Sequence, residues 1–89
     1  MSEITEEEKA MFRDAIADLT QIIDDNPEQF ESYNDRGFAY YVIQEFDKAI
    51  ADLRISISLC PTDPFAFYVY NLVVNEMQKE NTSVDELRD

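Results

Sequence analysis

The sequence repeats itself at an offset of 34 residues. The segment Phe12–Leu19 (FRDAIADL) reappears as Phe46–Leu53 (FDKAIADL), and Pro27 matches Pro61 at the same offset. Apolar residues, small residues and prolines therefore keep one register over two copies. Self-similarity at a fixed period is typical of proteins in which one supersecondary unit stacks on the next. The chain is therefore predicted to fold as a short stack of such units.

The first copy has the hydrophobic periodicity of an α-helix. Its apolar residues recur at steps of three and four, which places them in one stripe on an α-helix: Phe12, Ala15, Ile16, Leu19, Ile22 and Ile23. Thr5 followed by Glu8 has the spacing of a capping box. This helix is therefore predicted from about Glu6 to Asp25, ending before Pro27.

Three further helices are expected over about 28–43, 46–59 and 64–80. Pro61 prevents continuation of the third, and Asp63 followed by Pro64 is typical of the start of the fourth. Gly37 lies in the middle of the second helix, where it costs about 1 kcal/mol of helix propensity relative to Ala. We expect this glycine to allow the close approach of a neighbouring helix, with Ala15 and Ala49 as the small residues facing it.

The period and its residues resemble the tetratricopeptide repeat, a helix-turn-helix unit of the same length. The positions of the central copy that fit the family's pattern are Tyr33, Gly37, Tyr40, Ala49, Leu53 and Pro61. Partial copies extend the resemblance from Phe12 to about Met77. The chain differs from the pattern at Arg36, where the family prefers an apolar residue, at Leu53, which replaces an aromatic, and at Asn71, which replaces a small residue.

The resemblance implies an all-α fold, built as an antiparallel stack of αα-hairpins with four main helices and a short C-terminal tail. Residues 1–89 would form a single domain that enters halfway through a repeat. Residues 1–27 would supply the second helix of a partial repeat and 28–61 a full repeat. Residues 62–80 would supply the first helix of a further repeat, followed by a tail over 81–89.

Charge limits the classes of partner. With 20 acidic and 7 basic residues the formal charge is −13, and a field of that sign repels nucleic-acid phosphates and anionic lipid headgroups. We therefore expect neither nucleic acid nor a membrane surface as a partner. The acidic segment Met1–Lys9 lacks the apolar region of a secretory signal, and no apolar run approaches the roughly 20 residues of a membrane span. A cytoplasmic location is expected.

Residues that most catalysis requires are missing from the composition. The sequence has no His, one Gly and one Cys, Cys60, which removes the commonest general base, phosphate-binding loops and thiolate metal clusters. We therefore predict a protein that is not an enzyme, with no catalytic residues, no metal site and no cofactor.

By the resemblance, the first helix of each pair lines a concave face that binds peptides. The residues expected there are Glu31, Asn34, Phe38, Tyr41, Val42, Phe65, Tyr68, Leu72, Asn75 and Glu76. The set is aromatic at its centre and acidic at its edges, which suits an apolar or amphipathic segment of a partner protein with basic flanks. The alternative for Phe38, Tyr41 and Tyr68 is packing within the chain itself.

Two functions fit these features. The first is a tetratricopeptide adaptor or small chaperone that covers an apolar segment of a partner protein. The second is an acidic immunity-type inhibitor that covers the basic active site of a toxin or nuclease. Ionic strength separates them, because association driven by charge slows as salt rises, whereas apolar capture responds little.

The expected fourth helix is apolar nearly all round, and such a helix is normally buried. We therefore expect another chain to cover it, most simply a second copy in a two-fold homodimer. The residues predicted for that oligomer interface are Tyr70, Leu72, Val73 and Met77. The alternative is a monomer in which the tail folds back over this helix.

Overall fold

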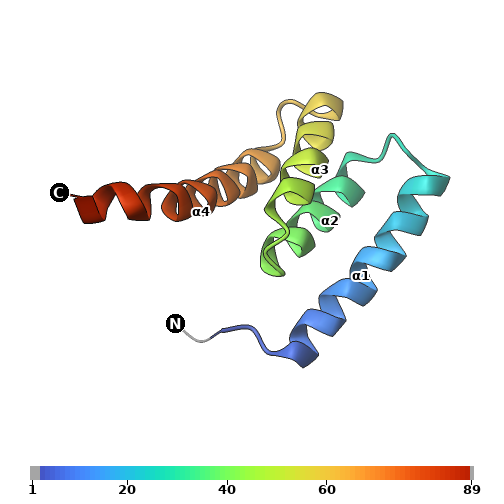
Figure 1. Ribbon diagram of the computed structural model, residues 1–89. Helices are drawn as coiled ribbons and strands as arrows, with labels where there is room; N and C mark the ends of the chain where they lie inside the picture. Colours follow the sequence, from blue (N-terminus) through green and yellow to red (C-terminus); the bar gives the residue numbers. More distant parts are fainter. Residues whose placement is uncertain (1–2, 89) are drawn as a thin grey trace.

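The computed structural model describes the backbone of residues 3–88 and the side chains of residues 3–79 (Figure 1). This backbone forms four α-helices: α1 (Glu6–Asp25), α2 (Phe30–Val42), α3 (Phe46–Leu59) and α4 (Pro64–Arg88). No strand occurs in the part of the chain that is described. The predicted all-α class with four helices is confirmed.

Local signals at its two ends fix the bounds of α1. Thr5 Oγ1 accepts a hydrogen bond from the Glu8 amide at 3.1 Å, and Glu8 Oε1 accepts one from the Thr5 amide at 2.9 Å. These two bonds are the predicted capping box and satisfy amides that would otherwise have no partner in the helix. The helix ends at Asp25, two residues before Pro27, as the sequence indicates.

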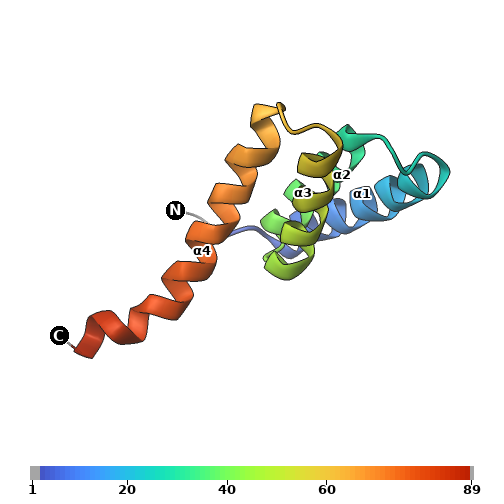
Figure 2. The same cartoon turned by 90° about the horizontal axis from the view of Figure 1, so that it is seen from above.

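The helices pack in the order of the sequence. α1 contacts α2, α2 contacts α3, and α3 contacts α4, while α2 also touches α4. The expected arrangement, in which α1 packs on α2 and α3 packs against both α2 and α4, is therefore confirmed. Figures 1 and 2 show that the C-terminal part of α4 extends beyond the other three helices.

The centre of the core lies where α2, α3 and α4 meet. Its fully buried side chains are Ala49 and Leu53 of α3 and Val69 and Val73 of α4. Gly37 of α2 lies against this cluster, and a Cβ atom there would stand only 3.0 Å from Leu53 Cγ. The close approach predicted for Gly37 and Ala49 is thus confirmed, whereas Ala15 of α1 is only partly buried.

The tail expected over 81–89 is helical through Arg88, and Asp89 lies outside the described residues. The prediction of a tail was wrong because polarity alone does not end a helix, and no Gly or Pro follows Pro64. Asp63 caps the start of α4, since its Oδ2 accepts a hydrogen bond from the Ala66 amide at 3.4 Å. The alternative in which the tail folds back over α4 is also wrong, since this segment continues the helix itself.

Candidate interaction surface

Four aromatic side chains from α2 and α4 form the surface that we call the aromatic surface: Phe38, Tyr41, Phe65 and Tyr68. The rings of Phe38 and Tyr41 lie 6.2 Å apart between centroids, one helical turn from each other on α2. Phe38 also meets Phe65 across the two helices, at 6.4 Å. Both distances fall in the range of favourable aromatic pairs.

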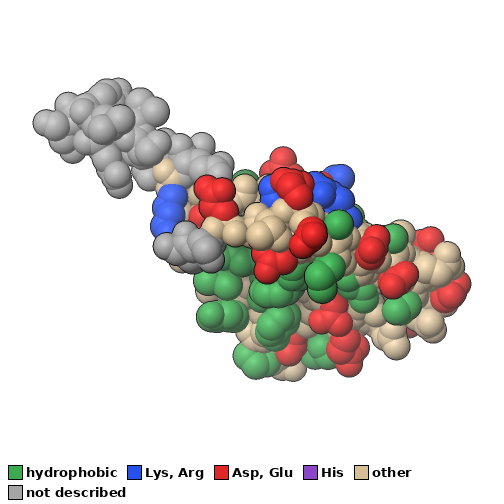
Figure 3. All heavy atoms as spheres, turned by 90° about the horizontal axis from the view of Figure 1, so that it is seen from below, with side chains coloured by type: hydrophobic (Ala, Val, Ile, Leu, Met, Phe, Trp, Pro, Cys, Tyr) green, Lys and Arg blue, Asp and Glu red, His purple; other side chains and the backbone are tan. Residues whose placement is uncertain are grey.

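The four residues differ in how far they are exposed to solvent. Tyr68 is 62% exposed, Phe65 42% and Phe38 37%. Tyr41 is only partly exposed and packs against the buried core. Tyr41 therefore packs largely within the chain itself, which was the alternative to a place on the binding face. Tyr68, in contrast, faces solvent. Figure 3 shows one face of the molecule on which hydrophobic side chains gather beside acidic ones.

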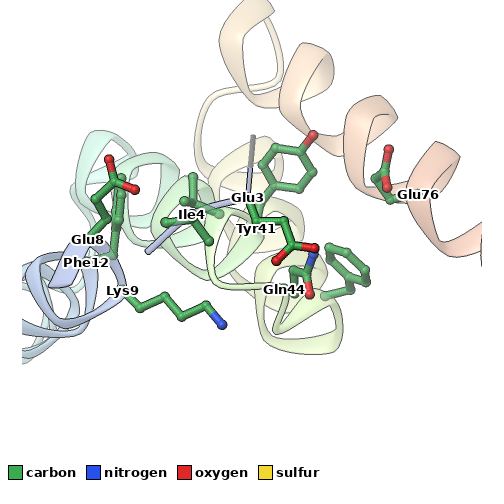
Figure 4. A pocket seen from close by; sticks show the side chains of 10 residues that line it. Glu3, Ile4, Glu8, Lys9, Phe12, Tyr41, Gln44 and Glu76 are labelled. Carbon is green, nitrogen blue, oxygen red and sulfur yellow. The ribbon is translucent and has the colours of Figure 1, made fainter. Parts of the chain in front are cut away.

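A cavity of about 660 Å³ adjoins the aromatic surface at the C-terminal end of α2. Its lining comes from the segment before α1 and the start of α1, the end of α2, the turn between α2 and α3, the first residue of α3, and one residue of α4 (Figure 4). The lining residues are Glu3, Ile4, Glu8, Lys9, Phe12, Tyr41, Val42, Gln44, Phe46 and Glu76. Of the residues predicted for the concave face, Tyr41, Val42 and Glu76 meet here.

The remaining predicted residues lie around these two features. Glu31 is exposed at the start of α2. Leu72 and Asn75 line a shallow depression on α4 that Glu76 shares. Burial raises the pKa of the nearby Asp35 carboxyl, and the charge of Glu31, one turn earlier, raises it further. This end of the aromatic surface therefore holds two carboxylates that repel each other.

Asn34 was predicted to contact a partner, and this prediction was wrong. Its side chain is buried, donates a hydrogen bond from Nδ2 to Asp63 Oδ2 at 2.7 Å, and accepts one from the Ser56 hydroxyl. Asn34 therefore joins α2 to α3 and to the cap of α4. A buried amide needs partners of this kind because an unsatisfied polar group costs roughly 1–3 kcal/mol.

Among the residues predicted for an oligomer interface, Val73 is fully buried within the single chain and cannot contact a second copy in this conformation. The reason is that α3 covers this side of α4. Tyr70 and Met77 are partly exposed and pack against the core cluster. Leu72 is also partly exposed, and at one helical turn from Tyr68 it shares the flank of the aromatic surface.

The sequence did not indicate that α1 and the residues just before it contribute to the cavity. Glu3, Ile4 and Glu8 reach the end of α2 because α1 and α2 form an antiparallel hairpin, so that the start of one helix lies near the end of the other. The lengths of the two helices could have indicated this contact, because α1 has 20 residues and α2 only 13. The conformation of Gln44, whose φ is 68°, could not be read from its residue type.

Within the described residues, no group of three or more acidic, histidine or cysteine side chains is placed to hold a metal ion. None of the helices, over the residues described, has the length and apolar character needed to cross a membrane. Comparison of the chain with protein-family models, with curated proteins and with solved structures gave no match.

Proposed function

We propose that this chain is a protein-interaction module of the tetratricopeptide type, an adaptor or small chaperone without catalytic activity. It binds an apolar or amphipathic segment of a partner protein on the aromatic surface. The observation that carries the proposal is the exposure of three large rings, Phe38, Phe65 and Tyr68, on two helices that touch each other. The 34-residue offset and the successive packing of the helices support the repeat assignment.

Exposed rings of this size favour binding on physical grounds. An aromatic side chain buries roughly 150–250 Å² when it is covered, and interfaces draw much of their affinity from a few such residues. Phe38 and Phe65 already contact each other, so their positions are largely set before a partner arrives. A surface that is ordered beforehand loses less conformational entropy on binding.

The acidic surroundings limit the chemistry of the partner. Glu31 and Asp35 lie at one end of the aromatic surface and Glu76 at the other, within a chain of net charge −13. A segment that presents apolar side chains together with Lys or Arg complements this pattern, whereas an acidic segment is repelled.

The test uses short random peptides displayed on phage and selected against the intact protein. We expect the selected peptides to share at least two large apolar residues. Phe38→Ser and Tyr68→Ser should each weaken binding of those peptides about tenfold, the effect of losing one aromatic anchor. Circular dichroism should show that both variants retain their helices.

Met11→Ser is the matched control, because Met11 is 68% exposed on α1, away from the aromatic surface. This variant loses apolar surface of comparable kind and should bind the peptides unchanged. Selection of peptides without apolar residues, or equal effects of all three substitutions, would refute the proposed function.

A further inference from the structure

The cavity at the end of α2 has its own electrostatic character. Among its lining residues, Glu3, Glu8 and Glu76 carry negative charge and Lys9 carries positive charge. Three negative charges against one positive leave a net charge of −2. The cavity therefore favours a cationic group over a neutral or anionic one.

Lys9 neutralises the cavity only in part, because it is one cation against three carboxylates among the lining residues. Lys9 Nζ lies 3.5 Å from Glu6 Oε2, and Glu6 is not among the lining residues. Glu76 has its own partner, Lys79, at 3.2 Å, but the side chains of that pair are 40% and 73% exposed. A pair so exposed to water contributes little, so Glu76 can exchange Lys79 for another cation at small cost.

Aromatic rings form one wall of the same cavity. The centroids of Tyr41 and Phe46 lie 6.2 Å apart, and both residues line the cavity. Figure 4 labels Tyr41 there. The face of an aromatic ring attracts a cation, and a guanidinium group can also lie flat against it. Carboxylates and ring faces around one space are together suited to the head and the carbon stem of a basic side chain.

Tyr41 belongs both to the cavity and to the aromatic surface, since its ring lies 6.2 Å from that of Phe38 and 6.2 Å from that of Phe46. A segment seated on Phe38 can therefore reach the cavity without a break. We propose that the cavity receives an arginine or lysine side chain of the same partner segment whose apolar residues cover the aromatic surface. This inference rests on the proposed function and adds a specificity pocket to it.

The test compares selected peptides with and without their basic residue. Peptides selected from the random phage library should carry Arg or Lys at a constant spacing from an apolar residue. The double variant Glu3→Gln, Glu76→Gln should bind these peptides about fivefold more weakly, as expected for exposed charge pairs. Peptides in which the basic residue is replaced by Gln should bind the variant and the unchanged protein equally.

The double variant Glu7→Gln, Asp18→Asn is the matched control, because it removes two exposed charges of α1 that lie outside the cavity lining. It should weaken binding less than twofold. Selected peptides that share apolar residues but no basic residue would overturn the inference and leave the proposed function standing. Loss of affinity in the control equal to that in the cavity variant would also overturn it, since the effect would then come from net charge alone.

Discussion

The guanidinium of Arg36 and the carboxylate of Asp52 meet through two parallel hydrogen bonds. Arg36 Nε donates to Asp52 Oδ2 at 2.7 Å and Nη2 donates to Oδ1 at 2.8 Å. Arg36 Nη1 also donates to the Thr20 hydroxyl at 3.0 Å. One side chain of α2 thus ties together α1 and α3. The hydrogen bond to Asp52, helped by the charge of that carboxylate, raises the pKa of Arg36 above its usual range, although burial acts against this shift.

Asp52→Asn should therefore lower the free energy of unfolding by about 3 kcal/mol, because it leaves the largely buried charge of Arg36 without its partner. The side chains of Arg36 and Asp52 are only 17% and 4% exposed. The midpoint of urea denaturation measures the change. Glu76→Gln is the control, since it breaks the exposed pair with Lys79 and should cost less than about 1 kcal/mol. Equal costs would mean that the Arg36 pair contributes no more than a surface ion pair.

The small residue at the crossing of α2 and α3 gives a second prediction. Ala49→Leu should destabilise the fold by about 1–3 kcal/mol, because Ala49 is fully buried and its surroundings have no space for three more carbon atoms. Ala51→Leu is the matched control on the exposed face of the same helix and should change the free energy of unfolding by less than about 0.5 kcal/mol. If the two substitutions behave alike in urea denaturation, the packing of α3 is not as described.

The turn between α2 and α3 should be stabilised by a glycine. Gln44 has a φ of 68°, in the left-handed region that costs a non-glycine residue roughly 1 kcal/mol. Gln44→Gly should therefore raise the thermal midpoint, corresponding to a gain of about 0.5–1 kcal/mol. Ala17→Gly on the exposed side of α1 should lower it by a similar amount, because there the glycine replaces the best helix former. A loss of stability in Gln44→Gly would show that this turn does not require a positive φ.

Asp35 makes stability depend on pH in a defined direction. Its folded pKa lies above the ordinary 3.8, because burial and the charge of Glu31 disfavour the ionised carboxylate. The ionised form therefore destabilises the fold at neutral pH, and this cost disappears as pH falls through the folded pKa and below 3.8. Asp35→Asn should be more stable than the unchanged protein at pH 7 by a few tenths of a kcal/mol, with no difference at lower pH.

Urea denaturation at a series of pH values measures this difference. Asp14→Asn removes an exposed charge from α1 and controls for the general effect of lowering the net charge. A gain at pH 7 that is the same for both variants, or that persists below pH 3.8, would contradict the assignment to Asp35.

Local signals predicted α1 and the close packing at Gly37 because each depends on residues near one another in sequence. Thr5, Glu8 and Pro27 fix the bounds of α1 wherever the helix packs. Arg36 shows the opposite case, since its partner Asp52 lies 16 positions away and only the packing of α2 on α3 brings them together. The departure of Arg36 from the family's pattern was visible in the sequence, but its acidic partner was not.

The candidate site was predictable in part for the same reason. The residues of one face follow from helical periodicity, so Phe38, Phe65 and Tyr68 could be placed on α2 and α4 in advance. Whether a helix face is buried depends on which other element covers it, and that element cannot be read from the sequence. Asn34 and Val73 were wrongly assigned to contact surfaces, because the side-chain hydrogen bond from Asn34 to Asp63 and the cover that α3 gives to Val73 arise only in the folded chain.

The homodimer remains a prediction, and since Val73 is buried we now expect it on the flank of α4 away from Tyr68. Phe67, Tyr70 and Val74 are spaced three and four residues apart, so they share one face, and Phe67 is 45% exposed. Pairing of this flank with the same flank of a second copy is the simplest closed arrangement. Light scattering after size exclusion should detect a species of twice 10.4 kDa.

Phe67→Asp should dissociate this dimer while the helices remain folded, whereas Tyr68→Asp on the opposite flank should leave it intact. Val73→Asp is unsuitable for the test, because burying an unpaired carboxylate would unfold the chain itself. Since each copy carries a charge of −13, repulsion opposes association, and added salt should strengthen the dimer by screening that repulsion. A species of 10.4 kDa at micromolar concentration in high salt would show that the Phe67 flank does not pair with itself.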